Sequence, residues 1–255
     1  MAFSSFQAAK TRFRRAPATA SGATAEVDFA QPEAEAVGVR PDAGPARIRP
    51  YRLTDRATVR RICCDNGCLG APIDPVVADR DIFAAIFLDP YIDYRPDWAI
   101  VAEIDGRVVG YLVAAVDAGF AVCQVREGFR VFMKLLLRLL HKRGNLPPQD
   151  RRFLRWLLTR SWRERPRRPD TPAHMHFSIE DGNRGRYIAQ RLWREFERRC
   201  AEAGIRHYFG EVMTADPEQV TQVYGRYGLR VFDRRRSTML DGVMRRPVWT
   251  LCFAK

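Results

Sequence analysis

The chain of 255 residues is strongly basic, with 43 Lys and Arg against 30 Asp and Glu and a formal net charge of +13. Apolar residues make up 46% of it and charged residues 29%. This balance excludes disorder for most of the chain, a collagen-like fibre and a small disulfide scaffold. The length suffices for one large domain with a full core. The positive charge favours an anionic partner: phosphates, nucleic acid, anionic lipid or an acidic substrate.

Six cysteines are scattered along the chain. They predict free, mostly buried thiols in a reduced compartment, and hence a cytoplasmic protein. Cys63, Cys64 and Cys68 lie close together, but no second ligand pair at zinc spacing follows, so we expect no metal site. An organelle is the alternative location, because residues 1–25 contain basic but no acidic residues, as transit peptides do. No apolar run approaches the ~20 residues of a membrane span.

Residues 1–45 are rich in Ala, Pro, Gly and Thr and lack a sustained hydrophobic period, which predicts a disordered tail or linker. The globular domain is then expected over 46–255. It opens with a short alternating strand at 47–52 and continues with a helix capped by Thr54 or Asp55. A loop at 66–72 precedes a second helical stretch over 76–88.

Two apolar strands are predicted next, at 98–104 and 107–115, with Asp105 and Gly106 as the tight turn of a hairpin. The second half resumes the alternation of strand and helix. We expect strands at 174–179 and 206–213, each followed by a helix, and a closing hairpin over 230–253. The order of elements predicts an α/β fold with a mixed central sheet flanked by helices, rather than a doubly wound parallel sheet.

An inserted pair of basic helices interrupts this rhythm at about 121–170. Basic residues recur every four positions from Arg126 to Lys142, with apolar residues between them, and a second basic amphipathic stretch follows. The insertion holds 14 Lys and Arg and 4 Asp and Glu, a net +10. Three interpretations stay open: a hairpin that covers the sheet, a lid over an acceptor pocket, and a peripheral contact with an anionic membrane. Nucleic acid is not the expected partner, because no nucleic-acid reader motif is present.

Taken in order, these elements resemble the GNAT superfamily of acetyl-CoA-dependent N-acyltransferases. The resemblance covers about 47–255 without the insertion. The opening 48–55 resembles the family's first strand and helix start, and the hairpin followed by Val109-Gly110-Tyr111 resembles its third strand. The segment 224–229 resembles the family's late motif, in which a Tyr precedes a Gly by four residues. A position where the family often has Asn holds Pro217.

The family's cofactor loop corresponds here to Arg184, Gly185, Arg186, Tyr187, Ile188 and Ala189. A strand that runs into a helix start leaves backbone N–H groups unpaired, and the helix dipole adds positive potential, so such a turn can hold a pyrophosphate. Arg184 and Arg186 would add charge-assisted contacts to phosphate. The family usually has Gly at the position of Tyr187, so the phosphate's approach depends on that side chain pointing away.

The resemblance implies that Tyr224 donates a proton to the leaving thiolate. A general base must take the proton of the attacking amine. Glu211 lies mid-strand among apolar neighbours, where a raised pKa would suit a base. Glu180 and His176 on the preceding strand are alternatives, and so is a chain of waters; His174 shares a strand face with His176.

The expected function is therefore that of an N-acetyltransferase. It would move an acetyl group from acetyl-CoA to an amine acceptor by direct transfer in a ternary complex, with a small molecule or sugar favoured as acceptor. The alternative is a GNAT-like module without catalysis that binds an anionic partner through its basic helices.

Overall fold

Seven strands form one sheet in the order β1-β2-β3-β4-β5-β7-β6 in the computed structural model, which describes residues 45–141, 146–184 and 187–255, with the backbone alone for 134–141. β4 and β5 run parallel, and the other neighbouring pairs run antiparallel. The strands are β1 (Arg47–Pro50), β2 (Ala99–Ile104), β3 (Arg107–Ala115), β4 (His174–Ile179), β5 (Phe209–Thr214), β6 (Arg230–Ser237) and β7 (Val248–Ala254). The mixed sheet expected from the sequence is confirmed.

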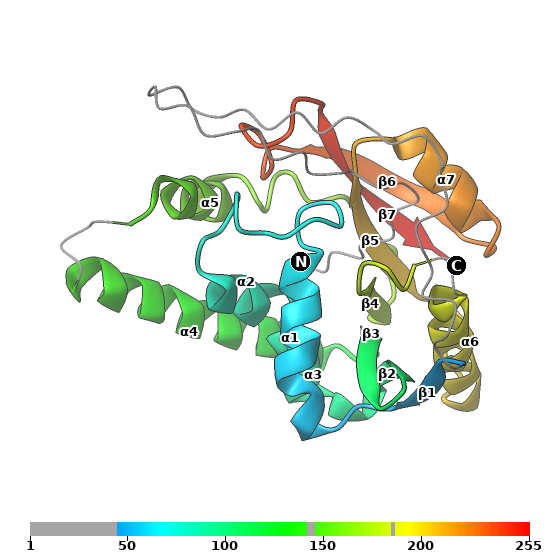
Figure 1. Ribbon diagram of the computed structural model, residues 1–255. Coiled ribbons are helices and arrows are strands. Elements are labelled where there is room, and N and C mark those ends of the chain that lie inside the picture. The colour runs from blue at the N-terminus through cyan, green and yellow to red at the C-terminus, as the bar shows by residue number, and fades with distance from the viewer. Residues whose placement is uncertain (1–44, 142–145, 185–186) are drawn as a thin grey trace.

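Helices cover both faces of this sheet (Figure 1). One face carries α1 (Arg56–Asp65), α2 (Arg80–Phe87), α3 (Asp89–Tyr94), α4 (Gly119–His141) and α5 (Pro148–Thr159), whose buried side chains share one core cluster. The other face carries α6 (Ile188–Glu202) and α7 (Pro217–Gly225), which share a second cluster. Alternate residues of the central strands enter the two cores: Tyr111 and Val113 enter the first, and Leu112 enters the second.

The predicted hairpin turn between β2 and β3 is present. Asp105 and Gly106 have φ values of 50° and 76°. Two consecutive residues with positive φ form the turn whose twist matches that of the flanking strands, and Asp-Gly tolerates this conformation well. β3 is buried along nearly its whole length, as expected for a strand covered on both faces.

Two helical predictions differ from the structure. The stretch predicted as one helix over 76–88 contains α2 and is followed directly by α3, which the sequence did not predict as a separate helix. Pro90 stands in the first turn of α3, where a missing N–H costs nothing, so it starts a new helix after Leu88. The helix predicted over about twenty residues before Gly204 is the 15-residue α6, which begins at Ile188.

The inserted helices α4 and α5 extend the helical layer on the first face. Phe120 and Val131 of α4, and Phe153 and Trp156 of α5, belong to the same core as α1–α3. Within the described residues, no helix is both long and apolar enough to cross a membrane. The tail predicted for residues 1–45 lies, except for residue 45, outside the described residues.

Candidate functional site

The parallel strands β4 and β5 separate from each other along their length. They pair at two positions, His174 with Phe209 and Met175 with Gly210, although each strand has six residues. On their outer edges, β4 pairs with β3 and β5 pairs with β7 over all six residues. The facing edges of their C-terminal halves are therefore open, and backbone groups there lack a strand partner.

The start of α6 lies at the same edge of the sheet as this opening. The segment 180–187 joins the C-terminal end of β4 to the first residue of α6. The free N–H groups of the helix start and the helix dipole make that edge favourable for an anion. Gly185 and Arg186, two of the predicted cofactor residues, lie outside the described residues. Ile188, the first residue of α6, is buried, and Ala189 is half-buried.

Tyr187 caps α6 with a left-handed backbone. Its φ is 58°, and its carbonyl accepts a hydrogen bond from the backbone of Arg191 at 3.0 Å. A positive φ is the conformation that a glycine adopts freely and that a tyrosine adopts at a cost. The side chain is 76% exposed and points into solvent.

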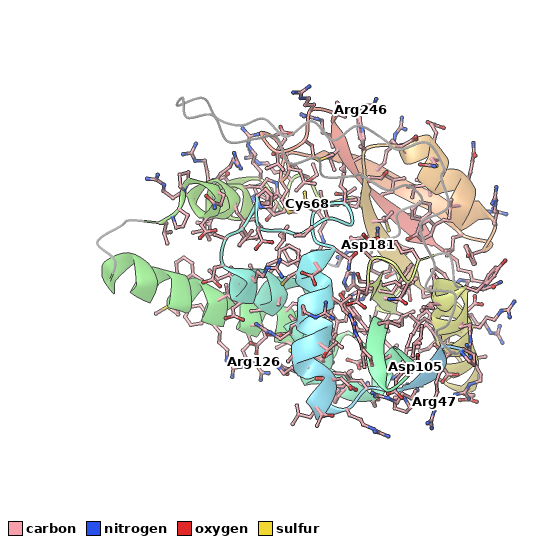
Figure 2. All side chains as sticks on the ribbon, in the orientation of Figure 1. Arg47, Cys68, Asp105, Arg126, Asp181 and Arg246 are labelled. Carbon is pink, nitrogen blue, oxygen red and sulfur yellow. The ribbon has the colours of Figure 1, made fainter. Side chains whose placement is uncertain are left out.

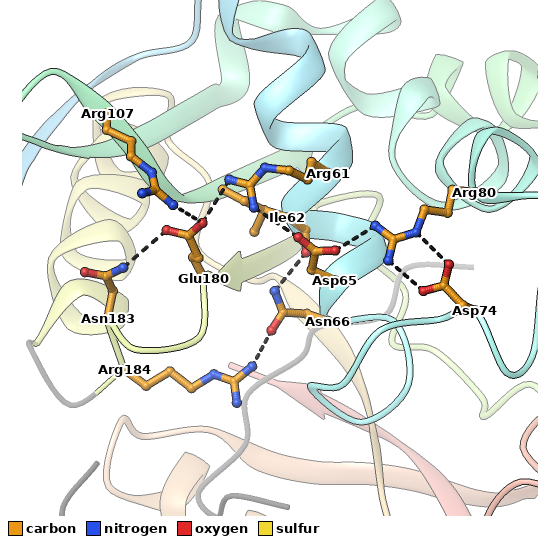
Figure 3. A network of polar contacts seen from close by, with 10 residues as sticks. All are labelled: Arg61, Ile62, Asp65, Asn66, Asp74, Arg80, Arg107, Glu180, Asn183 and Arg184. Carbon is orange, nitrogen blue, oxygen red and sulfur yellow. Dashed lines mark hydrogen bonds and ion pairs between the residues drawn. The ribbon is translucent and has the colours of Figure 1, made fainter. Parts of the chain in front are cut away.

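Arg184 holds the turn against the loop that follows α1 (Figure 3). Its guanidinium donates to Oδ1 of Asn66 and, at 3.2 Å, to the carbonyl of Gly70. Burial lowers the pKa of Arg184, and Asp181 at 3.7 Å offsets part of this effect. In this conformation Arg184, which we expected to contact a phosphate, instead binds oxygen atoms of the protein. It thereby positions the segment before α6.

Glu180, a predicted catalytic residue, is the centre of a charged network at the end of β4 (Figure 3). Its Oε1 accepts hydrogen bonds from Arg61 at 2.9 Å and from Arg107 at 2.5 Å. Its Oε2 accepts from Nδ2 of Asn183 at 3.3 Å. Both carboxylate oxygens are thus engaged, and Glu180 links α1, β3 and the turn.

Tyr224 lies on α7, one of the two helices that cover the second face of the sheet. Its ring stacks on Phe253 at 4.2 Å between centroids and meets the edge of Trp193 at 6.2 Å. Tyr224, Trp193, Phe177 and Tyr227 line a cavity of about 10 Å³, close to the volume that holds one water. Aromatic side chains from β4, α6 and α7 therefore meet beside the open strand edges.

Neither a protein-family model nor a curated protein matches this sequence. Among solved structures, SsHAT aligns with a TM-score of 0.55 at 22% identity, over 83% of this chain and 98% of its own. The protein has the GNAT fold. The polyamine N-acetyltransferase of Drosophila melanogaster aligns with a TM-score of 0.48 at 15% identity, over 82% of this chain and 99% of its own. YncA from Salmonella typhimurium, solved with its cofactor acetyl-CoA, aligns with a TM-score of 0.47 at 12% identity, over 83% and 94%.

In this GNAT fold, Glu211 does not have the raised pKa that we expected from its apolar neighbours. The residue is buried on β5, and its carboxylate accepts from Nε and Nη2 of Arg168 at 2.7 and 3.1 Å. Burial alone would raise the pKa of Glu211, but the charge and hydrogen bonds of Arg168 outweigh burial, so the pKa is lowered. The carboxylate is therefore the counter-ion of a half-buried arginine.

The two histidines of β4 lie on the first face, beside the start of the opening. Nε2 of His176 is 2.8 Å from the hydroxyl of Tyr111, and Nδ1 of His174 is 3.0 Å from the carbonyl of Pro172. The other ring nitrogens, Nδ1 of His176 and Nε2 of His174, are buried without a described partner. Burial lowers the pKa of both histidines to about 3, so both rings are neutral at physiological pH.

The sequence interpretation missed three residues of this site. Arg165 and Arg168 come from the segment between α5 and β4, and Tyr91 comes from α3. In the sequence the two arginines belong to the basic insertion and are not distinguished from its exposed arginines. The prolines at 166 and 169 are the one local signal, because they predict an extended segment that leaves the helical hairpin.

All six cysteines are free and buried. Burial raises the pKa of Cys64 and of Cys68 to about 12, and it raises that of Cys63 as well. These thiols are protonated at physiological pH and pack as small apolar side chains. No group of three or more metal-ligating side chains occurs in the part of the chain that the structure describes.

Proposed function

We propose that the protein is an N-acetyltransferase that moves the acetyl group of acetyl-CoA directly to an amine. The observation that carries the proposal is the separation of β4 from β5 beside the N-terminus of α6, within a GNAT fold. The open strand edges offer backbone donors and acceptors to an extended amide-containing arm. The helix start offers N–H groups to a pyrophosphate.

The residues present suit acetyl-CoA as the donor. The backbone carbonyl of Ala173 accepts a hydrogen bond from the backbone of Phe209, so Ala173 faces β5. Alternate residues of a strand direct their backbone groups to the same side, so Phe177 and Ile179 also present theirs at the open edge of β4. The side chain of Tyr187 is exposed and so does not pack over the start of α6. Acetyl-CoA supplies an activated thioester. Arg184 keeps the turn in place through Asn66.

In the proposed reaction the nitrogen of a neutral amine attacks the thioester carbon. A C–N bond forms, the C–S bond breaks, and the amine loses a proton while the thiolate gains one. We assign the proton donor to Tyr224. Both Glu180 and Glu211 have their oxygens engaged by arginines or an amide. Burial lowers the pKa of His176 to about 3, which makes its ring a weak base, so a chain of waters is the favoured route for the proton of the amine.

The experiment that tests the donor is calorimetric titration of the purified protein with acetyl-CoA and with CoA. We expect micromolar binding of both, accompanied by a higher melting temperature. Absence of binding to either ligand, in a protein that melts cooperatively, would contradict the proposal and favour a binding module without catalysis.

The role of Tyr224 is tested by Tyr224→Phe, with Tyr227→Phe as the matched control from the same aromatic cluster. We expect Tyr224→Phe to lower kcat about 100-fold with little change in the Kd of acetyl-CoA, because only proton transfer is lost. Tyr227→Phe should keep kcat within about twofold. Equal kcat in the two variants would remove Tyr224 as the proton donor.

A second function, compatible with the first, is suggested by the outer face of α4. Four exposed apolar residues follow one another at spacings of three, four and three: Val122, Val125, Phe129 and Phe132, here named the α4 stripe. Arg126 and Arg130 are exposed beside it, and Arg126 points away from α5 (Figure 2). We propose that the α4 stripe contacts an anionic membrane surface. A second copy of the chain would bring the same arginines together, which is unfavourable.

The membrane contact is tested by sedimentation with vesicles of phosphatidylcholine, with or without about one third phosphatidylserine. We expect binding to the anionic vesicles alone, and its loss in Phe129→Asp but not in Phe232→Asp, an exposed phenylalanine on β6. No binding, or equal binding by both variants, would contradict the proposal. Concentration-dependent dimerisation that Phe129→Asp abolishes would assign the stripe to a second copy instead.

A further inference from the structure

A cluster of buried polar side chains lies on the first face of the sheet, where β4 and β5 begin to separate. The ring of Tyr91 is 5.4 Å from that of His174 and 6.4 Å from that of His176. Arg165 reaches the same place, because its Nε lies 4.0 Å from Oε1 of Glu211. The cluster thus combines groups from α3, β4, β5 and the segment that follows α5.

Five polar atoms of this cluster are buried without a hydrogen-bond partner among the described residues. They are the Tyr91 hydroxyl, Nε and Nη2 of Arg165, Nε2 of His174 and Nδ1 of His176. A buried polar atom without a partner costs about 1–3 kcal/mol, and folded proteins contain few of them. Their concentration at one place indicates a bound group that satisfies several of them together.

The charges of the cluster show which kind of group fits. Arg168 and Arg165 carry two positive charges, whereas Glu211 carries one negative charge and is hydrogen-bonded to Arg168. Burial and the charge of Arg168 both lower the pKa of Arg165, and Glu211 offsets this in part. Because the histidines are neutral, one positive charge of the cluster has no matching anion among the described residues.

The free edge of Arg165 has the geometry of an oxyanion receptor. Nε and Nη2 are the two parallel N–H donors that bind a carboxylate or phosphate in bidentate fashion. The Arg165 side chain as a whole is 34% exposed, whereas its Nε and Nη2 atoms are buried. The Tyr91 hydroxyl adds a donor beside that edge.

Contacts on both sides of Arg165 hold its segment in place. Glu164 accepts hydrogen bonds from the indole of Trp156 at 2.8 Å and from the backbone N–H of Thr238 at 2.7 Å. The backbone N–H of Arg167 donates to Asp233 at 2.7 Å. The arginine is thus prepositioned by α5, β6 and the residue that follows β6, and a ligand does not need to order it.

We propose that Arg165 and Tyr91, beside the two histidines of β4, bind an oxyanion of the acceptor, so that the acceptor is an amine that also carries a carboxylate or a phosphate. This inference rests on the proposed function, since it names the class of amine that the acetyltransferase takes. The role of the basic insertion is then to place the substrate-binding Arg165 against the sheet.

The test compares acceptors that differ only in the oxyanion. Arginine is paired with agmatine, histidine with histamine, and glucosamine 6-phosphate with glucosamine, each assayed with acetyl-CoA. We expect kcat/KM to be about 10- to 100-fold higher for the anionic member of one pair, which is the worth of hydrogen bonds to a charged group. A preference in the amino-acid pairs identifies a carboxylate, and a preference in the sugar pair identifies a phosphate.

Arg165→Gln should reduce this preference to about threefold or less, mainly through the KM of the anionic member. Arg165→Lys keeps the charge without the two parallel donors and should also lose most of the preference, which decides the matter if the Gln variant does not fold. The neighbouring exposed Arg163→Gln is the control and should keep the preference. Equal use of both members of every pair would overturn this inference alone. Failure to acetylate any of them would overturn the proposed function together with it.

Discussion

At the scale of single residues, Tyr187 combines two properties that conflict. Its backbone is left-handed, with a φ of 58°, yet its side chain is 76% exposed and contributes little packing. The left-handed conformation costs a residue with a Cβ about 1–2 kcal/mol. The turn before α6 therefore keeps the backbone that the helix start requires, at the expense of stability.

We expect Tyr187→Gly to be about 1 kcal/mol more stable than Tyr187→Ala in urea unfolding. Glycine relieves the left-handed strain but gains entropy in the unfolded chain, so the net difference is smaller than the strain itself. Alanine is the matched control, because it removes the ring and keeps the Cβ. A glycine variant no more stable than the alanine variant would show that the turn does not hold a left-handed residue here.

Glu211 shows that the pKa of a buried carboxylate depends on the charged group beside it. Its pKa lies below the ordinary value of 4.5 because Arg168 outweighs the effect of burial. A carboxylate with a lowered folded-state pKa adds stability above its unfolded pKa, and that contribution is lost as the pH falls through the folded value.

Removing this carboxylate should therefore have an effect that depends on pH. Glu211→Gln leaves the half-buried Arg168 without its counter-ion and should cost about 3 kcal/mol at pH 7. The difference from the native protein should shrink as the pH falls below 4.5, the ordinary value of the carboxyl. Glu218→Gln, which changes a carboxylate whose side chain is 86% exposed on α7, is the control and should cost less than about 1 kcal/mol. A difference that stays constant from pH 7 to pH 3 would contradict the assigned ion pair.

At the scale of elements, α7 begins at a well-defined cap. The side chain of Asp216 accepts from the backbone N–H of Gln219 at 3.0 Å, and Pro217 occupies the first helical position. Pro217 suits this position, because its fixed φ matches a helix start. The cap sets where α7 begins and hence where Tyr224 lies.

We expect Asp216→Ala to destabilise the protein by about 1 kcal/mol, because one N–H of the first turn loses its acceptor. Glu218→Ala changes an exposed residue in the same turn and should stay within about 0.5 kcal/mol of the native protein. Thermal unfolding of both variants measures the difference. Equal melting temperatures would show that Asp216 does not cap α7.

At the scale of the whole molecule, the positive charge is unevenly distributed along the chain. The insertion at 121–170 carries a net +10 of the chain's +13. Part of it is exposed beside the α4 stripe, whereas Arg165 and Arg168 turn inward to the sheet. One inserted segment therefore serves a surface and a buried site, which composition alone does not distinguish.

The composition of residues 1–44 predicts that they add nothing to the stability of the domain. The chain that begins at residue 45 should melt within about 2 °C of the full chain in calorimetry, since a loss of 1 kcal/mol in a domain of this size shifts the melting temperature by about 2–4 °C. A decrease of several degrees would show that the segment packs on the domain.

The sequence alone determined the order of strands and helices, the Asp105-Gly106 turn and the mixed sheet. These features depend on hydrophobic period and turn chemistry within a few residues, which a single chain displays directly. The same local signals predicted the turn before α6 and the placement of Tyr224 on the helix after β5. They did not predict the break between α2 and α3, which depends on where Leu88 and Pro90 pack.

Only the tertiary structure decided the chemistry of the candidate site. The hydrogen-bonded residues Glu211 and Arg168 are separated by 43 positions in the sequence, and Glu180 and Arg61 are separated by 119. Whether a buried carboxylate has a raised or a lowered pKa depends on such a partner, and local sequence contains no record of it. The atoms of Arg165, Tyr91, His174 and His176 that lack a hydrogen-bond partner likewise come from segments far apart in the sequence. Only the folding of the chain brings them together, so their spacing in the sequence does not reveal the site.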